Sequence, residues 1–118
     1  AEKNNGAFFN NERIRVSKKN ELSECLFATG GKRYNSINEI STRKSGCAAL
    51  DLAYVASGRY DGYCESNLNL WDIAAGLIII KEAGGVINDI DLKNHKNLNV
   101  IVSSPNINDK FTKKISNF

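Results

Sequence analysis

Methionine is absent from all 118 residues, position 1 included. We therefore expect this sequence to be a piece of a longer chain, or a chain whose start was processed or removed. Nothing at the start has the form of a signal peptide. No apolar run is long enough to cross a membrane, because the longest one, residues 73–80, contains Gly76 and is soon followed by Lys81 and Glu82. The sequence thus predicts a soluble protein with no membrane partner.

Cysteine and histidine are also scarce. The three cysteines, Cys25, Cys47 and Cys64, are odd in number and form no Cys-x-x-Cys pair. Their apolar neighbours are typical of reduced, buried thiols in the cytoplasm. A catalytic cysteine needs a histidine partner, and the single histidine, His95, stands in a polar segment of Asn and Lys. We expect a cytoplasmic protein without cysteine catalysis.

Charge is neither strong nor clustered. Sixteen basic and 13 acidic residues give a formal net charge of +3, and hydrophobic residues make up 42% of the chain. The basic pairs at 18–19 and 113–114 are too short to form a stripe for phosphate backbones. This composition favours one globular domain and excludes nucleic acid as an expected partner.

The strongest pattern lies in residues 71–85. Apolar residues recur there at the spacing of one helix face, and two glycines end the segment. The helix is so apolar that we expect it to be buried on every broad side. The residues of the apolar face are Ile73, Leu77, Ile80 and Ala83.

Asp72 stands at the entrance of this helix. Free backbone N–H groups and the helix dipole favour its ionised form there, and such a carboxylate is a good ligand for Mg²⁺. The plain alternative is that Asp72 only caps the helix. An aromatic residue directly before it and the apolar body of the helix favour the metal site.

A second helix is expected within residues 43–58, ending at Gly58, with a face of small residues for close packing on a sheet. Gly46 precedes this helix and allows close approach either of a ligand or of another element. Residues 60–65 alternate as in a strand, and Glu65 falls at the end of that strand. The expected small-residue face consists of Ala49, Leu52, Ala53 and Ala56.

The remaining segments predict a hairpin, further strands and a last helix. Residues 7–9 and 14–16 are β-prone and flank a turn at 10–13, and residues 17–23 form a connector. Strands are expected at 25–29, 86–87 and 99–103. Residues 107–118 predict an amphipathic helix with Ile107, Phe111 and Ile115 on one face. This order of elements indicates an α/β layer.

Trp71-Asp72, the alanine-rich apolar helix and the closing Glu-Ala-Gly-Gly resemble the carboxy-terminal signature of the inositol monophosphatase family. The hairpin region, Glu2 to Ser17, also resembles this family, so the likeness runs from the first residues to the last. It implies the carboxy-terminal sheet-and-helix domain of the sugar phosphatase fold over residues 18–118. Residues 1–17 would be a hairpin of the amino-terminal sheet.

The resemblance also implies a set of site residues. Asp72 would be a ligand of Mg²⁺, and Glu65 would bind a substrate hydroxyl, although a glutamate at a loop edge is ordinarily a solvated charge. The turn of Gly46, Cys47 and Ala48 would contact substrate hydroxyls through its backbone. Serine or threonine is commoner than Cys47 in the family, so no hydroxyl role is carried over to that side chain. No catalytic residue beyond the metal ligand is expected in this chain.

The sequence departs from the family at two places. Residues 32–42 are shorter than the family's helix there, which means either a shortened helix or missing residues. The other metal motif, Asp-x-x-Asp-Gly-Thr, is absent, because the residue three before Asp61 is Gly58. We expect the chain to be inactive alone.

The function expected for the full-length protein is Mg²⁺-dependent hydrolysis of a small phosphate monoester, first of all inositol monophosphate. A phosphatase of sugar bisphosphates or nucleotide-type phosphates, or a non-catalytic binding or assembly module, are the alternatives. Family analogy also implies a homodimer.

Overall fold

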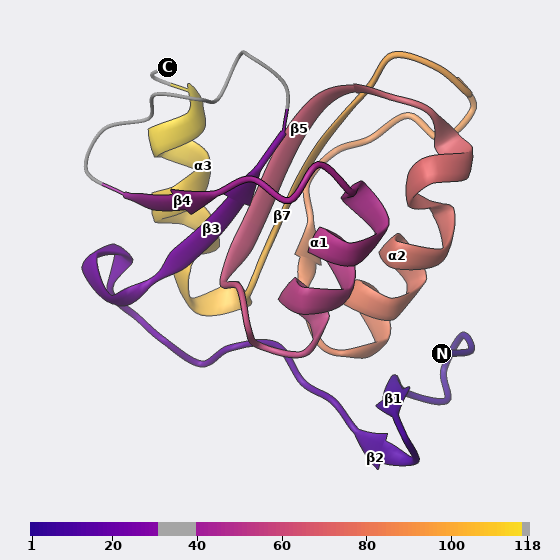
Figure 1. Ribbon diagram of the computed structural model, residues 1–118, viewed down its shortest axis with the longest axis horizontal. Coiled ribbons are helices and arrows are strands. Elements are labelled where there is room, and N and C mark those ends of the chain that lie inside the picture. Colours follow the sequence, from indigo (N-terminus) through magenta and orange to yellow (C-terminus); the bar gives the residue numbers. More distant parts are fainter. Residues whose placement is uncertain (31–39, 117–118) are drawn as a thin grey trace.

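The computed structural model describes residues 1–30 and 40–116 and is built around a sheet of five strands (Figure 1). The strands lie in the order β4, β3, β5, β7 and β6. The first three are parallel, and β7 runs antiparallel to both of its neighbours. Their bounds are Ser41–Arg43 for β4, Leu26–Thr29 for β3, Gly62–Leu68 for β5, Leu98–Ser103 for β7 and Val86–Ile87 for β6.

Helices cover both faces of this sheet. Side chains alternate between the faces along a strand, so neighbouring residues belong to different cores. Tyr63 packs in the cluster that contains the residues of α1 (Ala48–Ala56) and α2 (Leu70–Glu82). Cys64 packs in the cluster that contains Phe111 of α3 (Asn108–Ser116). The expected α/β fold, with a layered sheet and helices, is therefore confirmed.

The hairpin forms a separate two-stranded sheet of β1 (Phe8–Phe9) and β2 (Glu12–Arg13). Asn10 and Asn11 make its turn at φ values of 49° and 67°, the left-handed region that asparagine tolerates. The expected turn at 10–13 was thus too long, and the prediction of a strand at 14–16 was wrong, because the second strand is Glu12–Arg13. The hairpin region is tied to the end of α2, since the Gly6 N–H donates to Glu82 Oε1 at 2.9 Å.

The long helix α2 has a buried side and an open side. Ile73, Leu77 and Ile80 are buried as expected, and Gly76 is buried with them. A Cβ on Gly76 would lie 2.5 Å from Leu52 Cδ1, so the absence of a side chain at Gly76 allows α1 and α2 to pack closely. Trp71, however, is 66% exposed, which corrects the expectation that this helix is buried on every broad side.

The buried face of α1 also differs from the expected one. Leu52 and Ala56 are buried as predicted, but Ala49 is exposed, and Asp51 and Val55 are buried in its place. The side of the helix that meets the sheet is therefore rotated toward Asp51. Gly58 follows the end of the helix at φ 79°, as a terminating glycine should.

The connector between the hairpin and the sheet contains one short 3-10 turn, Leu22–Glu24. A second 3-10 turn, Pro105–Ile107, leads into α3, and Ile107 of this turn is buried in one cluster with Phe111 and Ile115 of the helix, as predicted. The shortened-helix question concerns residues 32–42, most of which lie outside the described residues, and Ser41 and Thr42 at the described end belong to strand β4. Among the residues that are described, no helix combines the length and the apolar character needed to cross a membrane.

Candidate functional site

A cavity of about 430 Å³ lies where α1 and α2 begin. All five residues predicted for the site line it, and they come from three separate segments of the chain. Gly46, Cys47 and Ala48 come from the start of α1, Glu65 from β5, and Asp72 from the first turn of α2. Ala49, Leu68 and Trp71 complete the lining and were not predicted for it.

The turn before α1 is held by a buried carboxylate. The Ser45 hydroxyl donates to Asp51 Oδ1 at 2.7 Å, and Ser45 Oγ in turn accepts the Cys47 N–H at 3.1 Å. The Cys47 carbonyl lies farther from the hydroxyl, at 3.4 Å, and a hydroxyl has one proton to donate. Asp51 therefore accepts the one hydrogen bond that the Ser45 hydroxyl donates, and this bond fixes the orientation in which Ser45 holds the turn.

Asp72 occupies the third position of α2 and not the cap itself. Asn69 is the capping residue, and its N–H donates to Asp72 Oδ2 at 3.2 Å. This reciprocal arrangement is a capping box, which stabilises the first turn. Capping and a place at the cavity are thus combined in the same carboxylate, because Asp72 also lines the cavity.

Glu65 reaches the cavity from an irregular part of β5. The strand continues past Glu65 to Leu68, with a shift of register between the two, so Glu65 is not the last residue of the strand as expected. Burial raises the pKa of the Glu65 carboxyl above its ordinary value of 4.5, the Tyr63 hydroxyl opposes that rise, and the carboxylates of Asp51 and Asp72 add to it. The lining of the cavity thus includes two carboxyl groups, those of Glu65 and Asp72.

Replacing Asp51 with asparagine should raise the free energy of unfolding at pH 7, with a gain that fades as the pH falls through the raised folded pKa toward 3.8. Burial raises the pKa of the Asp51 carboxyl above its ordinary 3.8, and the Ser45 hydrogen bond opposes this. The folded chain then keeps a proton that the unfolded chain has released, so stability falls as pH rises through the folded pKa. Asparagine keeps an oxygen for Ser45 and removes the charge.

Urea unfolding of both proteins over a pH series measures this difference. Asp89→Asn, at an exposed position, controls for the general effect of one lost negative charge. A variant that is destabilised more at pH 7 than at low pH would contradict the assignment.

The cysteines fall into two classes. Cys25 and Cys64 are buried, and burial is the main cause that raises their pKa values, to about 11 and about 12. Cys47 is exposed at the cavity, which corrects the expectation that all three thiols are buried.

The donor chemistry of the cavity fits Mg²⁺ in part. Asp72 offers the hard carboxylate oxygen that this ion prefers. Among the described residues, however, no group of three or more His, Cys, Asp or Glu side chains is placed to hold a metal ion. Asp72 would therefore hold the ion only together with ligands from outside residues 1–30 and 40–116.

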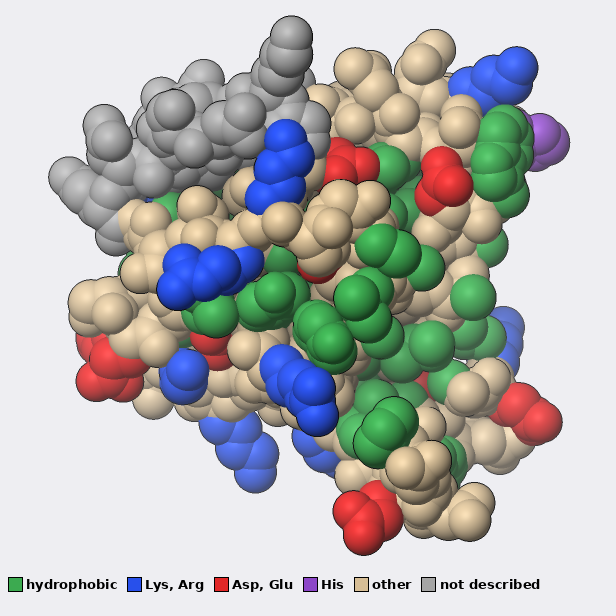
Figure 2. Space-filling view, in the orientation of Figure 1, with side chains coloured by type: hydrophobic (Ala, Val, Ile, Leu, Met, Phe, Trp, Pro, Cys, Tyr) green, Lys and Arg blue, Asp and Glu red, His purple; other side chains and the backbone are tan. Residues whose placement is uncertain are grey.

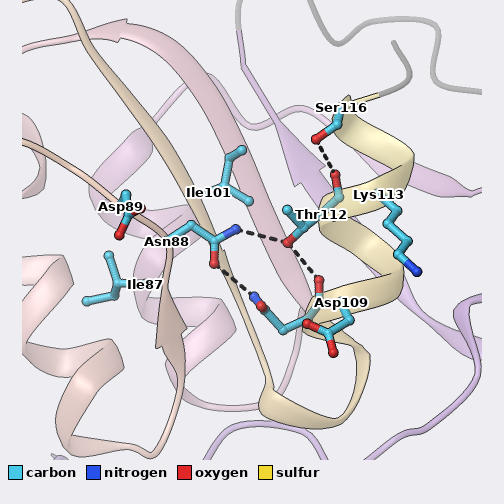
Figure 3. A pocket seen from close by; sticks show the side chains of 9 residues that line it. Ile87, Asn88, Asp89, Ile101, Asp109, Thr112, Lys113 and Ser116 are labelled. Carbon is cyan, nitrogen blue, oxygen red and sulfur yellow. Dashed lines mark hydrogen bonds between the residues drawn. The ribbon is translucent and has the colours of Figure 1, made fainter.

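A larger cleft of about 690 Å³ lies between α3 and the β6 edge of the sheet (Figure 3). The side chains at its centre form hydrogen bonds with one another. Asn88 donates to Thr112 Oγ1 at 2.9 Å, and Asn108 donates to Asn88 Oδ1 at 3.1 Å. This network ties α3 to Asn88, the residue that follows strand β6, and none of the predicted site residues lines the cleft. The smaller cavity is the better candidate site.

Sequence reasoning missed the pair of Ser45 and Asp51. The signal that would have shown it is a charged residue on the otherwise apolar side of a short helix. Such a residue needs a partner when it is buried, and a serine just before the helix supplies one.

Comparison with known proteins agrees with the resemblance. Residues 1–117 match the family described as the inositol monophosphatase family. The chain is 44% identical over 126 residues to the fructose-1,6-bisphosphatase/inositol-1-monophosphatase of Thermotoga maritima, covering 98% of this chain and 49% of the relative. It is 42% identical over 103 residues to the Nus factor SuhB of Salmonella typhimurium, covering 75% and 39%.

The solved structure of extragenic suppressor protein suhB from Bartonella henselae superimposes with a TM-score of 0.85. Its sequence identity is 41%, and the match covers 98% of this chain and 52% of that one. The chain thus spans about half the length of the relatives it matches, or less.

Proposed function

Because the chain belongs to the inositol monophosphatase family, we propose that the longer protein containing it hydrolyses small phosphate monoesters with Mg²⁺, inositol monophosphate being the first substrate to test. The observation that carries this proposal is the convergence of the five predicted site residues on one cavity. The activity is proposed for the longer protein, since this chain spans only about half of its relatives.

The residues of the chain have distinct roles in this proposal. Asp72 holds the ion with ligands from elsewhere, and Glu65 orients a substrate hydroxyl. The turn of Gly46, Cys47 and Ala48 contacts further hydroxyls through its backbone. Mg²⁺, when bound, polarises phosphoryl oxygens and lowers the pKa of an attacking water.

The open apolar surface supports the idea that more protein packs on this segment. Figure 2 shows hydrophobic side chains gathered over α1 and α2 on the face turned to the viewer. Leu50 and Trp71 are 41% and 66% exposed, and Phe8 and Phe9 of the hairpin are 52% and 63% exposed. Large apolar side chains grouped in this way favour an interaction surface. We propose that the chain alone is inactive for this reason and because its described residues place no group of three or more potential ligands around a metal ion.

Phosphate release from inositol monophosphate tests the proposal. The chain alone should show none above background with Mg²⁺. The longer protein, or this chain joined to the amino-terminal half of the Thermotoga maritima relative, should show activity that a chelator abolishes. Turnover by the chain alone would overturn the idea that it is incomplete, and an inactive longer protein would overturn the proposed activity.

Two alternatives have support from the names of relatives. The Thermotoga maritima name includes a sugar bisphosphatase activity, which the same assay tests with fructose 1,6-bisphosphate. The name of the Salmonella typhimurium relative, Nus factor SuhB, names no phosphatase activity, so the second alternative is the non-catalytic binding or assembly module. A longer protein without further carboxylate ligands would support that second role. Homodimer formation and a cytoplasmic location stay predictions.

A further inference from the structure

Gly30 lies beside the candidate substrate-binding carboxylate in the sheet. Strands β3 and β5 are parallel neighbours, with Thr29 opposite Cys64. One residue further on, the Gly30 N–H donates to the Cys64 carbonyl at 3.2 Å. Gly30 and Glu65 therefore stand next to each other on the face that carries α1 and α2, because side chains two residues apart share a face.

The space that a side chain on Gly30 would fill is taken by Glu65. A Cβ on Gly30 would lie 1.2 Å from Glu65 Oε1 and 2.1 Å from Glu65 Cδ. The carboxylate thus rests directly on the bare Cα of the neighbouring strand. Its place in the cavity is possible only while residue 30 has no side chain.

Backbone conformation does not explain this glycine. Gly6, Gly46, Gly58 and Gly84 are the described glycines with positive φ, and Gly30 is not among them. An alanine at position 30 would therefore be compatible with the backbone. The reason for glycine at this position is room for a side chain, and that side chain lines the candidate site.

We propose that Gly30 is a positioning residue that sets the orientation of Glu65 and thereby the selectivity for hydroxyl-bearing phosphate esters. The inference rests on the proposed function for the choice of substrate, but the placement of Glu65 by Gly30 rests on the geometry alone. Gly30 itself touches no substrate. Its absent side chain acts through Glu65.

Gly30→Ala in the longer protein tests the inference. The Glu65 side chain is flexible and is able to rotate away from an alanine at position 30. The fold should therefore be kept while the carboxylate is displaced. The selectivity for inositol monophosphate over p-nitrophenyl phosphate, measured as the ratio of kcat/KM values, should fall about tenfold, since the lost hydrogen bond involves a charged group. In a Glu65→Ala background, Gly30→Ala should cause no further fall.

Gly62→Ala is the matched control. Gly62 also has no positive φ, but its Cβ would meet the rings of Phe27 and Phe111 at 2.9 and 3.0 Å. Core rings have no open space to swing into, so this variant should lower the thermal midpoint and leave the selectivity ratio unchanged. Gly30→Ala should lower the selectivity ratio and leave the thermal midpoint unchanged. A merely structural role of Gly30 would lower kcat/KM equally for both substrates.

Equal losses of selectivity from Gly30→Ala with and without Glu65 would overturn the inference, as would no loss. A crystal structure of the Gly30→Ala chain gives an independent decision, because the carboxylate should be displaced from residue 30. If the longer protein hydrolyses neither substrate, the proposed function falls, and this structure still decides whether Gly30 places Glu65.

Discussion

Asp72→Asn in the longer protein should lower turnover at limiting Mg²⁺ by on the order of 100-fold or more, because one anionic ligand is lost from a doubly charged ion. The fold should be largely kept, since the amide oxygen of asparagine is still able to accept the Asn69 N–H that Asp72 accepts now. Titration of activity with Mg²⁺ measures the effect, and high Mg²⁺ should restore part of the rate.

Asp109→Asn is the matched control for this substitution. Asp109 is also an exposed aspartate in the first turn of a helix, but it lines the other cleft. Its replacement should leave the Mg²⁺ dependence unchanged. Equal activity of the Asp72 variant and the wild type at limiting Mg²⁺ would mean that Asp72 only caps α2.

Phe111→Ala should lower the free energy of unfolding of the chain by about 3–5 kcal/mol, the usual cost of removing a buried aromatic ring. Phe111 is fully buried and stacks on Phe27 with 4.3 Å between the ring centroids. The two rings hold α3 against the sheet, so removal of the Phe111 ring opens a cavity between the helix and the sheet. The total free energy of unfolding of a domain is only about 5–15 kcal/mol, so this loss is a large fraction of it.

Phe8→Ala makes the same chemical change at a side chain that is 52% exposed, and should change the free energy by no more than about 0.5 kcal/mol. Urea unfolding curves of the three proteins give the values. A Phe111 variant as stable as the Phe8 variant would show that α3 is not held by this ring pair.

Local pattern and the family likeness together predicted the parts of the candidate site. The apolar spacing of α2 and the glycines after it depend on residues close in sequence, and they located the first turn that carries Asp72. The family likeness then pointed to Glu65 and the turn at 46–48, which the structure brings to the same cavity. Their roles in binding stay predictions until the variants are measured.

The sequence by itself determined where α2, α3 and the strands β3, β5 and β7 form, because hydrogen bonds along a helix and alternation along a strand are set by near neighbours. It did not predict strand β4. Only the tertiary structure decided that β3 lies beside β5, so that Gly30 makes room for Glu65. It also decided that α1 turns its Asp51 inward to Ser45 and that α2 keeps Trp71 exposed. These contacts depend on the order of strands and the packing of two helices, which bring together residues that share no local pattern.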